Sequence, residues 1–244
     1  MADAFVELAP GAYRIPLSPL DFINAFAFVH DDGQVTLVDT GVPQSSPRIM
    51  AGLEAIGSHA MNVTRIVLTH AHPDHVGSIG PTRRALPVED IAAHEVDAPW
   101  IEQGTPPKRD ERTVLGRYLN RQIDSGSTAW EPVPVTERLV DGQLIDGTGL
   151  RVHHTPGHTL GHIALVHEPT GVLITGDSIF HLPWGIQWSI PLFCIDVPLN
   201  KRTAHVLGDL DYEVAAFTHG TEVRDNAREQ VRGFLRRKAQ RAGR

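Results

Sequence analysis

The chain has one cysteine, no long apolar run and no excess of positive charge, and each absence excludes a class of protein. The single cysteine, Cys194, excludes a disulfide framework and a thiolate metal cluster. No apolar run approaches the ~20 residues that cross a membrane. The net charge of −7 argues against nucleic acid or an anionic membrane as the main partner. The first residues do not resemble a secretory signal, so we expect a cytoplasmic protein.

Length and composition indicate one globular domain. The 244 residues, 41% hydrophobic and 21% charged, fit a single domain over residues 1–244. Short β-branched and apolar runs predict strands, and apolar residues at helical spacing predict helices. The predicted strands cover residues 13–15, 25–30, 34–39, 63–68, 91–93, 138–140, 150–154, 163–167, 172–175 and 214–217. The predicted helices cover residues 47–56, 108–122, 200–207 and 224–241, and another begins at Pro73 or Asp74.

Two stretches interrupt this pattern. Residues 97–137 are rich in proline around an arginine-rich helix, and we interpret them as an insertion over the fold that acts as a lid. Four arginines of this insertion either face an anionic substrate or form a solvated helix face. They are Arg109, Arg112, Arg117 and Arg121. Residues 180–199 are apolar and are predicted to be irregular.

Five histidines and two aspartates follow the ends of predicted strands in a fixed order. They are His70, His72, Asp74, His75, His158, Asp177 and His219. Imidazoles and carboxylates suit zinc, iron or manganese, and this number provides three ligands for each of two ions plus a shared carboxylate. Such a set leaves a position for water, as a catalytic site needs. The other histidines are interpreted as ordinary surface or core residues, except that His162 is expected to pack or hydrogen-bond against the ligands.

The motif His70-Ala71-His72-Pro73-Asp74-His75, with the later elements, resembles the metallo-β-lactamase-fold hydrolase superfamily, and its glyoxalase II and lactonase group in particular. The resemblance covers about residues 10–240 and implies an αββα sandwich, with two mixed β-sheets flanked by helices. It implies that the first metal binds to His70, His72 and His158, the second to Asp74, His75 and His219, and that Asp177 bridges them. Asp39, in Val38-Asp39-Thr40-Gly41, would be a buried residue that organises the loop near the ligands, although a turn-forming aspartate fits equally.

The chemistry that this resemblance implies is hydrolysis. Two divalent ions, zinc in the first place and iron or manganese otherwise, lower the pKa of a shared water and supply hydroxide to an ester, thioester or lactone. Asp74 would be catalytic as well as a ligand, orienting this nucleophile or carrying its proton. One alternative stays open, because a single Fe(II) held by His70, His158 and Asp177 would resemble the persulfide dioxygenases of this fold. A non-catalytic scaffold is disfavoured, because so many polar groups at one place are costly to keep.

The sequence also narrows the substrate. Residues 175–180 look most like glyoxalase II, whereas lactonases of the family carry a tyrosine where this chain has Phe180. After His219 a single helix is predicted, in place of the glyoxalase II helical domain with its basic glutathione-binding residues. We interpret Phe180, Trp184 and Trp188 as a hydrophobic wall for the apolar acyl or aromatic part of a small-molecule substrate. Core packing or a homodimer contact is the alternative for these residues.

Overall fold

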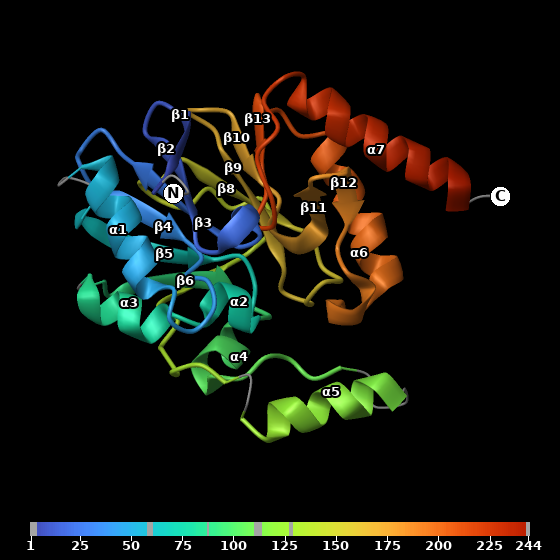
Figure 1. Ribbon diagram of the computed structural model, residues 1–244, viewed down its shortest axis with the longest axis horizontal. Coiled ribbons are helices and arrows are strands. Elements are labelled where there is room, and N and C mark those ends of the chain that lie inside the picture. The colour runs from blue at the N-terminus through green and yellow to red at the C-terminus, as the bar shows by residue number, and fades with distance from the viewer. Residues whose placement is uncertain (1–3, 58–60, 87, 110–113, 127–128, 243–244) are drawn as a thin grey trace.

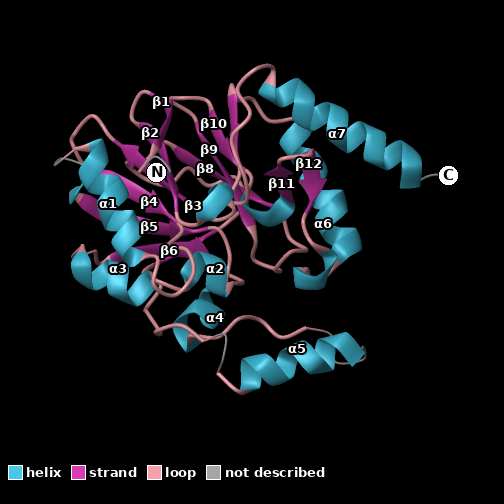
Figure 2. Ribbon diagram, in the orientation of Figure 1, coloured by secondary structure: helices cyan, strands magenta, loops and turns pink. Residues whose placement is uncertain are grey.

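Two β-sheets form the centre of the molecule and lie face to face (Figures 1 and 2). A computed structural model describes residues 4–57, 61–86, 88–109, 114–126 and 129–242. The seven-stranded sheet contains, in spatial order, β1 (Val6–Ala9), β2 (Ala12–Pro16), β3 (Asn24–Val29), β4 (Val35–Val38), β5 (Val63–Leu68), β6 (Asp90–His94) and β7 (Glu137–Leu139). Strands β1 to β4 pair antiparallel and β4 to β7 pair parallel, so the sheet is mixed.

The second sheet has four strands and is also mixed. In spatial order it contains β13 (Val214–Ala216), β10 (Val172–Ile174), β9 (Ile163–His167) and β8 (Leu150–His154). The β13–β10 pair is parallel and the other pairs are antiparallel. A separate antiparallel hairpin joins β11 (Ile179–Leu182) to β12 (Gly185–Trp188).

Helices cover the outer faces of both sheets (Figure 1). On one side lie α1 (Ser46–Ile56) and α3 (Ile79–Ala85), and on the other lie α6 (Val197–Thr203) and α7 (Ala227–Ala242). The short α2 (Pro73–Val76) follows β5, while α4 (Ala98–Gln103) and α5 (Val114–Asp124) belong to the predicted insertion and lie at the lower edge of the view. The order helix, sheet, sheet, helix confirms the predicted αββα architecture. No helix in the described part of the chain is long and apolar enough to span a membrane.

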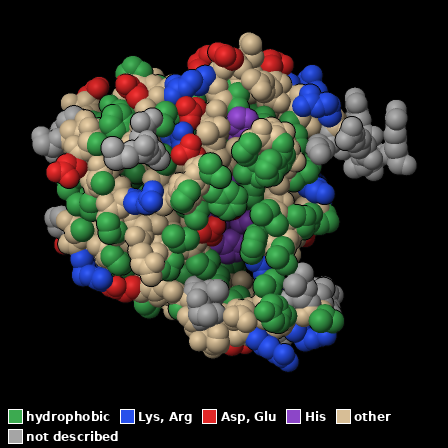
Figure 3. Space-filling view, in the orientation of Figure 1, with side chains coloured by type: hydrophobic (Ala, Val, Ile, Leu, Met, Phe, Trp, Pro, Cys, Tyr) green, Lys and Arg blue, Asp and Glu red, His purple; other side chains and the backbone are tan. Residues whose placement is uncertain are grey.

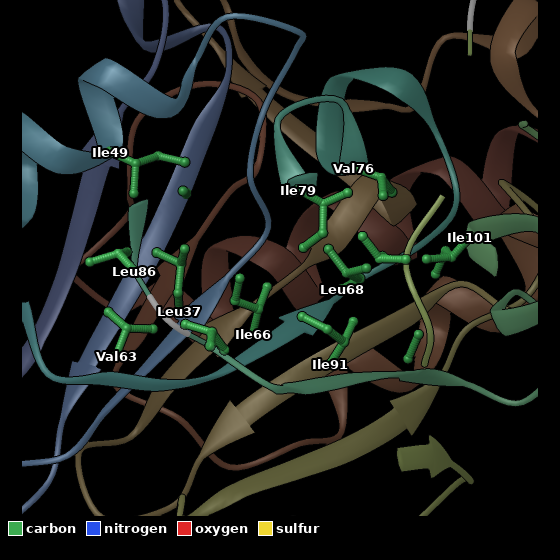
Figure 4. Close-up of a cluster of buried hydrophobic side chains, with 14 of the residues drawn as sticks. Leu37, Ile49, Val63, Ile66, Leu68, Val76, Ile79, Leu86, Ile91 and Ile101 are labelled. Carbon is green, nitrogen blue, oxygen red and sulfur yellow. The ribbon is translucent and has the colours of Figure 1, made fainter. Parts of the chain in front are cut away.

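Alternation along the strands explains why the first sheet is covered on both faces. Successive side chains of a strand point to opposite faces, so Ile66 and Leu68 of β5 pack under the helices while Val67 packs between the sheets. Figure 4 shows the first cluster, in which Ile49 of α1 and Ile79 of α3 approach these strands. Fully burying each such side chain contributes roughly 1.5–3 kcal/mol. Both faces of the first sheet are thereby buried.

Most predicted elements are found within a few residues of their expected places, but three differ. Residues 179–188 form the hairpin β11–β12 rather than irregular chain. Gly185, with φ of 106°, allows the tight turn between the strands, and the aromatic residues around it do not indicate this turn. The helix predicted at 200–207 begins earlier, where Asp196 caps α6 by accepting a hydrogen bond from Leu199 N. The helix predicted at 108–122 is α5, and residues 110–113 of that prediction lie outside the described chain. That the insertion moves as a lid stays a prediction.

Candidate metal centre

The loops after β5, β8, β10 and β13 bring the predicted ligands together. His72 is the extended residue before α2, with φ of −119° and ψ of 153°, so it continues the strand direction from His70. Pro73 then begins the helix, a position that suits proline because its missing N–H has no partner there anyway. The chain turns at this point, and the ring of His75 returns to pack 4.0 Å from the ring of His70.

The first group consists of three buried histidines whose ring nitrogens converge. His72 Nδ1 lies 3.1 Å from His70 Nε2 and 2.9 Å from His158 Nε2. Burial holds the pKa values of His70 and His158 well below the ordinary value and lowers the pKa of His72 to about 4. The three rings are therefore neutral, with nitrogen lone pairs available to a cation. One ion fits this donor set.

The second group contains two histidines and two carboxylates. His219 Nε2 lies 3.4 Å from Asp74 Oδ2 and 3.2 Å from Asp177 Oδ2, and His75 Nε2 lies 3.3 Å from Asp177 Oδ1. His75 Nε2 is buried and has no partner of hydrogen-bond geometry among the described residues. A buried nitrogen in this state is costly unless a ligand completes it. The group therefore also fits a metal ion.

Asp177 lies between the two groups. The same oxygen, Oδ2, is 3.2 Å from His158 Nε2 in the first group and 3.2 Å from His219 Nε2 in the second. Its Oδ1 accepts a hydrogen bond of 2.7 Å from Thr218 Oγ1, and its backbone N donates one of 2.6 Å to His162 Nε2. These contacts fix the carboxylate between the two groups, and its bridging role stays a prediction.

His162 packs beside His70 and hydrogen-bonds to the backbone of Asp177. Its Nδ1 lies 2.8 Å from Thr155 Oγ1 and 3.0 Å from Thr155 O, so Nδ1 is set to donate and Nε2 to accept. This contact requires glycine at position 176, because a Cβ there would collide with the His162 ring. The backbone of Gly176 also has a φ of 53°, which favours glycine. His162 thus positions Asp177 through its backbone.

Asp39 supports the ligands from the end of β4, beside the end of β5 in the same sheet. It is fully buried, and its Oδ2 lies 2.8 Å from His75 Nδ1. The carboxylate also accepts hydrogen bonds from Thr69 N, at 2.8 Å, and Thr69 Oγ1, at 2.7 Å. A carboxylate on Nδ1 directs the lone pair of His75 Nε2 toward the metal position. Asp39 is therefore in contact with a predicted ligand, and its organising role stays a prediction.

Asp97, which the sequence motifs do not single out, joins two ligand loops. Its Oδ2 accepts hydrogen bonds from Ala71 N, at 2.9 Å, and Thr159 Oγ1, at 2.6 Å, and its Oδ1 accepts one from Gly161 N, at 2.8 Å. Burial raises the pKa of this carboxyl. The signal that could have identified it is its position, since it follows a predicted strand as the ligands do.

The carboxylates of the second group favour protonation of its two histidines when no metal is bound. Burial opposes protonation of His219, but Asp177 and Asp74 outweigh it and raise the pKa of His219 to about 10. The same carboxylates, together with Asp39, raise the pKa of His75 well above its ordinary value. A cation at this group must displace these protons before it can bind the nitrogens.

We therefore expect zinc binding at neutral pH to release protons and to weaken as pH falls. Protons compete for His219 Nε2 at every pH below its pKa of about 10, so affinity should rise as pH approaches that value. Calorimetric titration in two buffers of different ionisation enthalpy measures the release. Equal observed enthalpies in both buffers would contradict this expectation.

Comparison with known proteins decides the family. A family model of the metallo-beta-lactamase superfamily matches residues 19–219. The chain belongs to the metallo-beta-lactamase superfamily. It is 26% identical over 197 residues to the probable metallo-hydrolase YybB of Bacillus subtilis, in a match that covers 80% of each chain. It is 24% identical over 157 residues to a hydroxyacylglutathione hydrolase of Rhodopseudomonas palustris, but this match covers 64% of this chain and 48% of that enzyme.

A solved structure agrees with this assignment. The crystal structure of a metallo-beta-lactamase family protein from Thermus thermophilus has a TM-score of 0.68 and 25% identity, over 96% of this chain and 81% of that chain. The superfamily predicted from the sequence is confirmed. Family and donor set together support a metal-dependent hydrolase, as predicted.

In this metallo-beta-lactamase superfamily member, a cavity of about 400 Å³ opens onto both groups. Ligand residues from both groups line it, namely His72, Asp74, His158, Asp177 and His219. Figure 3 shows histidine side chains beside carboxylates in a hollow that hydrophobic side chains border. The apolar walls include Phe22, Phe180, Ile190 and Phe193.

The predicted aromatic wall requires a correction. Phe180 lines the cavity, with its ring 4.4 Å from that of His219. Trp184 and Trp188 do not line it. Trp184 lies at the hairpin turn and is 73% exposed, and the Trp188 ring packs 5.0 Å from Phe234 of α7. The hairpin directs both tryptophans away from the metal groups.

Proposed function

We propose that the chain is a hydrolase that uses two divalent metal ions, zinc in the first place, to cleave an ester, thioester or lactone. The position of Asp177 carries this proposal, because one carboxylate oxygen lies 3.2 Å from a histidine nitrogen of each group. His70, His72 and His158 would hold one ion; Asp74, His75 and His219 would hold the other. Two such ions supply a nucleophile at neutral pH and polarise the acyl oxygen.

Asp74 is the residue best placed to handle the proton of the nucleophile. Both aspartates line the cavity, but the side chain of Asp74 is 35% exposed whereas Asp177 is buried. Burial opposes ionisation of Asp74, but His75 and His219 outweigh it and hold its pKa below the ordinary value. The carboxylate is therefore ionised at neutral pH and can accept a hydrogen bond from attacking water. The predicted catalytic role rests on this placement.

Substrate size and polarity follow from the cavity. A volume of about 400 Å³ with apolar walls fits a small acyl compound. The hydroxyacylglutathione hydrolase relative directs attention to thioesters among the three bond types. A small-molecule substrate with an apolar acyl or aromatic part fits both observations.

Metal counting together with a substrate panel tests the proposal. Protein purified without chelators or a His tag should contain about two ions of zinc or a related metal per chain. It should hydrolyse members of a panel of esters, thioesters and lactones, lose this activity on chelation and regain it on adding zinc. One equivalent of iron, with consumption of O₂ in the presence of glutathione persulfide, would instead favour the dioxygenase alternative.

A further inference from the structure

A single guanidinium faces the cavity beside the two metal groups. Among the described residues that line the cavity, Arg109 is the only arginine or lysine. The walls next to it are apolar, and they include Leu119 and Ile123 of α5 and Phe193 from across the cavity. Of the other arginines predicted to face a substrate, Arg117 and Arg121 are exposed and do not line the cavity, and Arg112 lies outside the described residues.

Hydrogen bonds hold Arg109 in this position from two directions. Its backbone N donates to Asn120 Oδ1 at 2.9 Å, and its carbonyl accepts from Asn120 Nδ2 at 3.0 Å. Asn120 is buried in α5, so the helix fixes the backbone of Arg109. The guanidinium donates one hydrogen bond, of 3.2 Å, to the carbonyl of Cys194 on the opposite wall. The side chain therefore extends across the cavity rather than into bulk solvent.

No carboxylate of the described chain lies within ion-pair distance of Arg109. The cavity carboxylates Asp74 and Asp177 instead pair with His75 and His219. Arg109 is half-buried, and burial lowers its pKa. Removing a cation from water without pairing it to an anion is costly. A guanidinium has five N–H donors, and the side chain of Arg109 makes one hydrogen bond to the described chain. An anionic ligand would compensate this cost.

We propose that Arg109 selects substrates that carry a carboxylate in addition to the scissile acyl group and an apolar body. The inference rests on the proposed hydrolase function and names its substrate class. The acyl group would lie at the two metal groups, and the apolar body against Phe180, Ile190 and Phe193. The carboxylate would accept a paired hydrogen bond from the guanidinium, the geometry that arginine provides and lysine does not.

The test measures binding of two unreactive ligands to the metal-loaded protein by calorimetry. Both are phenylalkyl amides of equal length, one ending in a carboxylate and the other in a neutral carboxamide. The wild type should bind the carboxylate about tenfold more tightly. Arg109→Gln should abolish this preference, Arg109→Lys should keep part of it, and Arg121→Gln, on the exposed face of α5, should keep all of it. A wild type without preference, or an Arg109→Gln protein that weakens for both ligands equally, would overturn the proposal.

The corresponding thioesters separate this inference from the proposed function. Arg109→Gln should raise KM for the carboxylate thioester about tenfold and leave kcat, and the KM of the neutral thioester, nearly unchanged. If neither thioester is cleaved and the binding preference still depends on Arg109, hydrolysis of this class is wrong and anion recognition stands. If both thioesters are cleaved and their KM values are the same in wild type and variant, the hydrolase function stands and anion recognition by Arg109 is wrong. Thermal melting of each variant shows whether it is folded.

Discussion

Asp177→Asn is expected to hold at most one ion per chain and to lose about a thousandfold in kcat/KM, equivalent to ~4 kcal/mol of transition-state stabilisation. The carboxylate Oδ2 is 3.2 Å from nitrogen atoms of both groups, so one substitution affects both ions. Asparagine keeps the size of the side chain but removes the charge and replaces one oxygen by an NH₂ group that cannot bind a metal. Elemental analysis and the turnover of a cleaved thioester or ester measure the result.

The matched control is Asp211→Asn, which makes the same chemical change at an exposed position. It should retain both ions and wild-type turnover. Comparing the melting temperatures of the two variants shows that the loss at Asp177 does not come from unfolding. Two ions and unchanged turnover in Asp177→Asn would contradict the bridging role.

Asp39→Asn is expected to weaken metal binding at the second group by about 10- to 100-fold. Asp39 Oδ2 faces His75 Nδ1 at 2.8 Å, and an amide NH₂ at this place would donate to Nδ1. His75 would then carry its proton on Nε2, the atom needed for the metal. Asparagine tolerates the left-handed backbone of Asp39, with φ of 61°, so the variant tests the side chain rather than the turn.

Asp39→Asn also disturbs the hydrogen bonds of Thr69, and we expect a loss of about 1–3 kcal/mol in the free energy of unfolding. Competition with a chromophoric chelator measures the metal affinity, and denaturant unfolding measures the stability. Asp32→Asn, in an exposed turn where the side chain accepts a hydrogen bond from Gln34 N, is the control. Wild-type metal affinity in Asp39→Asn would mean that this carboxylate only shapes the turn.

The convergence of the seven predicted ligands could be foreseen because each follows a strand, and strand ends meet at one edge of the sandwich. Alternation of apolar residues similarly reveals the strands themselves, since Ile66 and Val67 must face opposite sides. The family assignment came from the motif around His70 and is confirmed by comparison. These features depend on local order in the chain, which a sequence displays directly.

The aromatic segment after Asp177 shows where a sequence is insufficient. Phe180 and Trp188 belong to the two strands of one hairpin, yet Phe180 lies on the cavity and Trp188 on α7. Composition cannot tell which face of a hairpin looks toward the metals, because both faces are apolar. Asp97 was missed for a similar reason, since all three of its hydrogen-bond donors lie more than twenty residues away in the chain.

Asp97 also determines how strain in the sandwich reaches the metals. Its carboxylate joins the loop after β5 in one sheet, through Ala71, to the loop after β8 in the other, through Thr159 and Gly161. Sliding of one sheet over the other would break these bonds and separate His70 from His158 in the same movement. Substitutions between the sheets are therefore expected to alter metal affinity from a distance. Conversely, an ion held by both loops would resist shear between the sheets and stabilise the folded chain against unfolding.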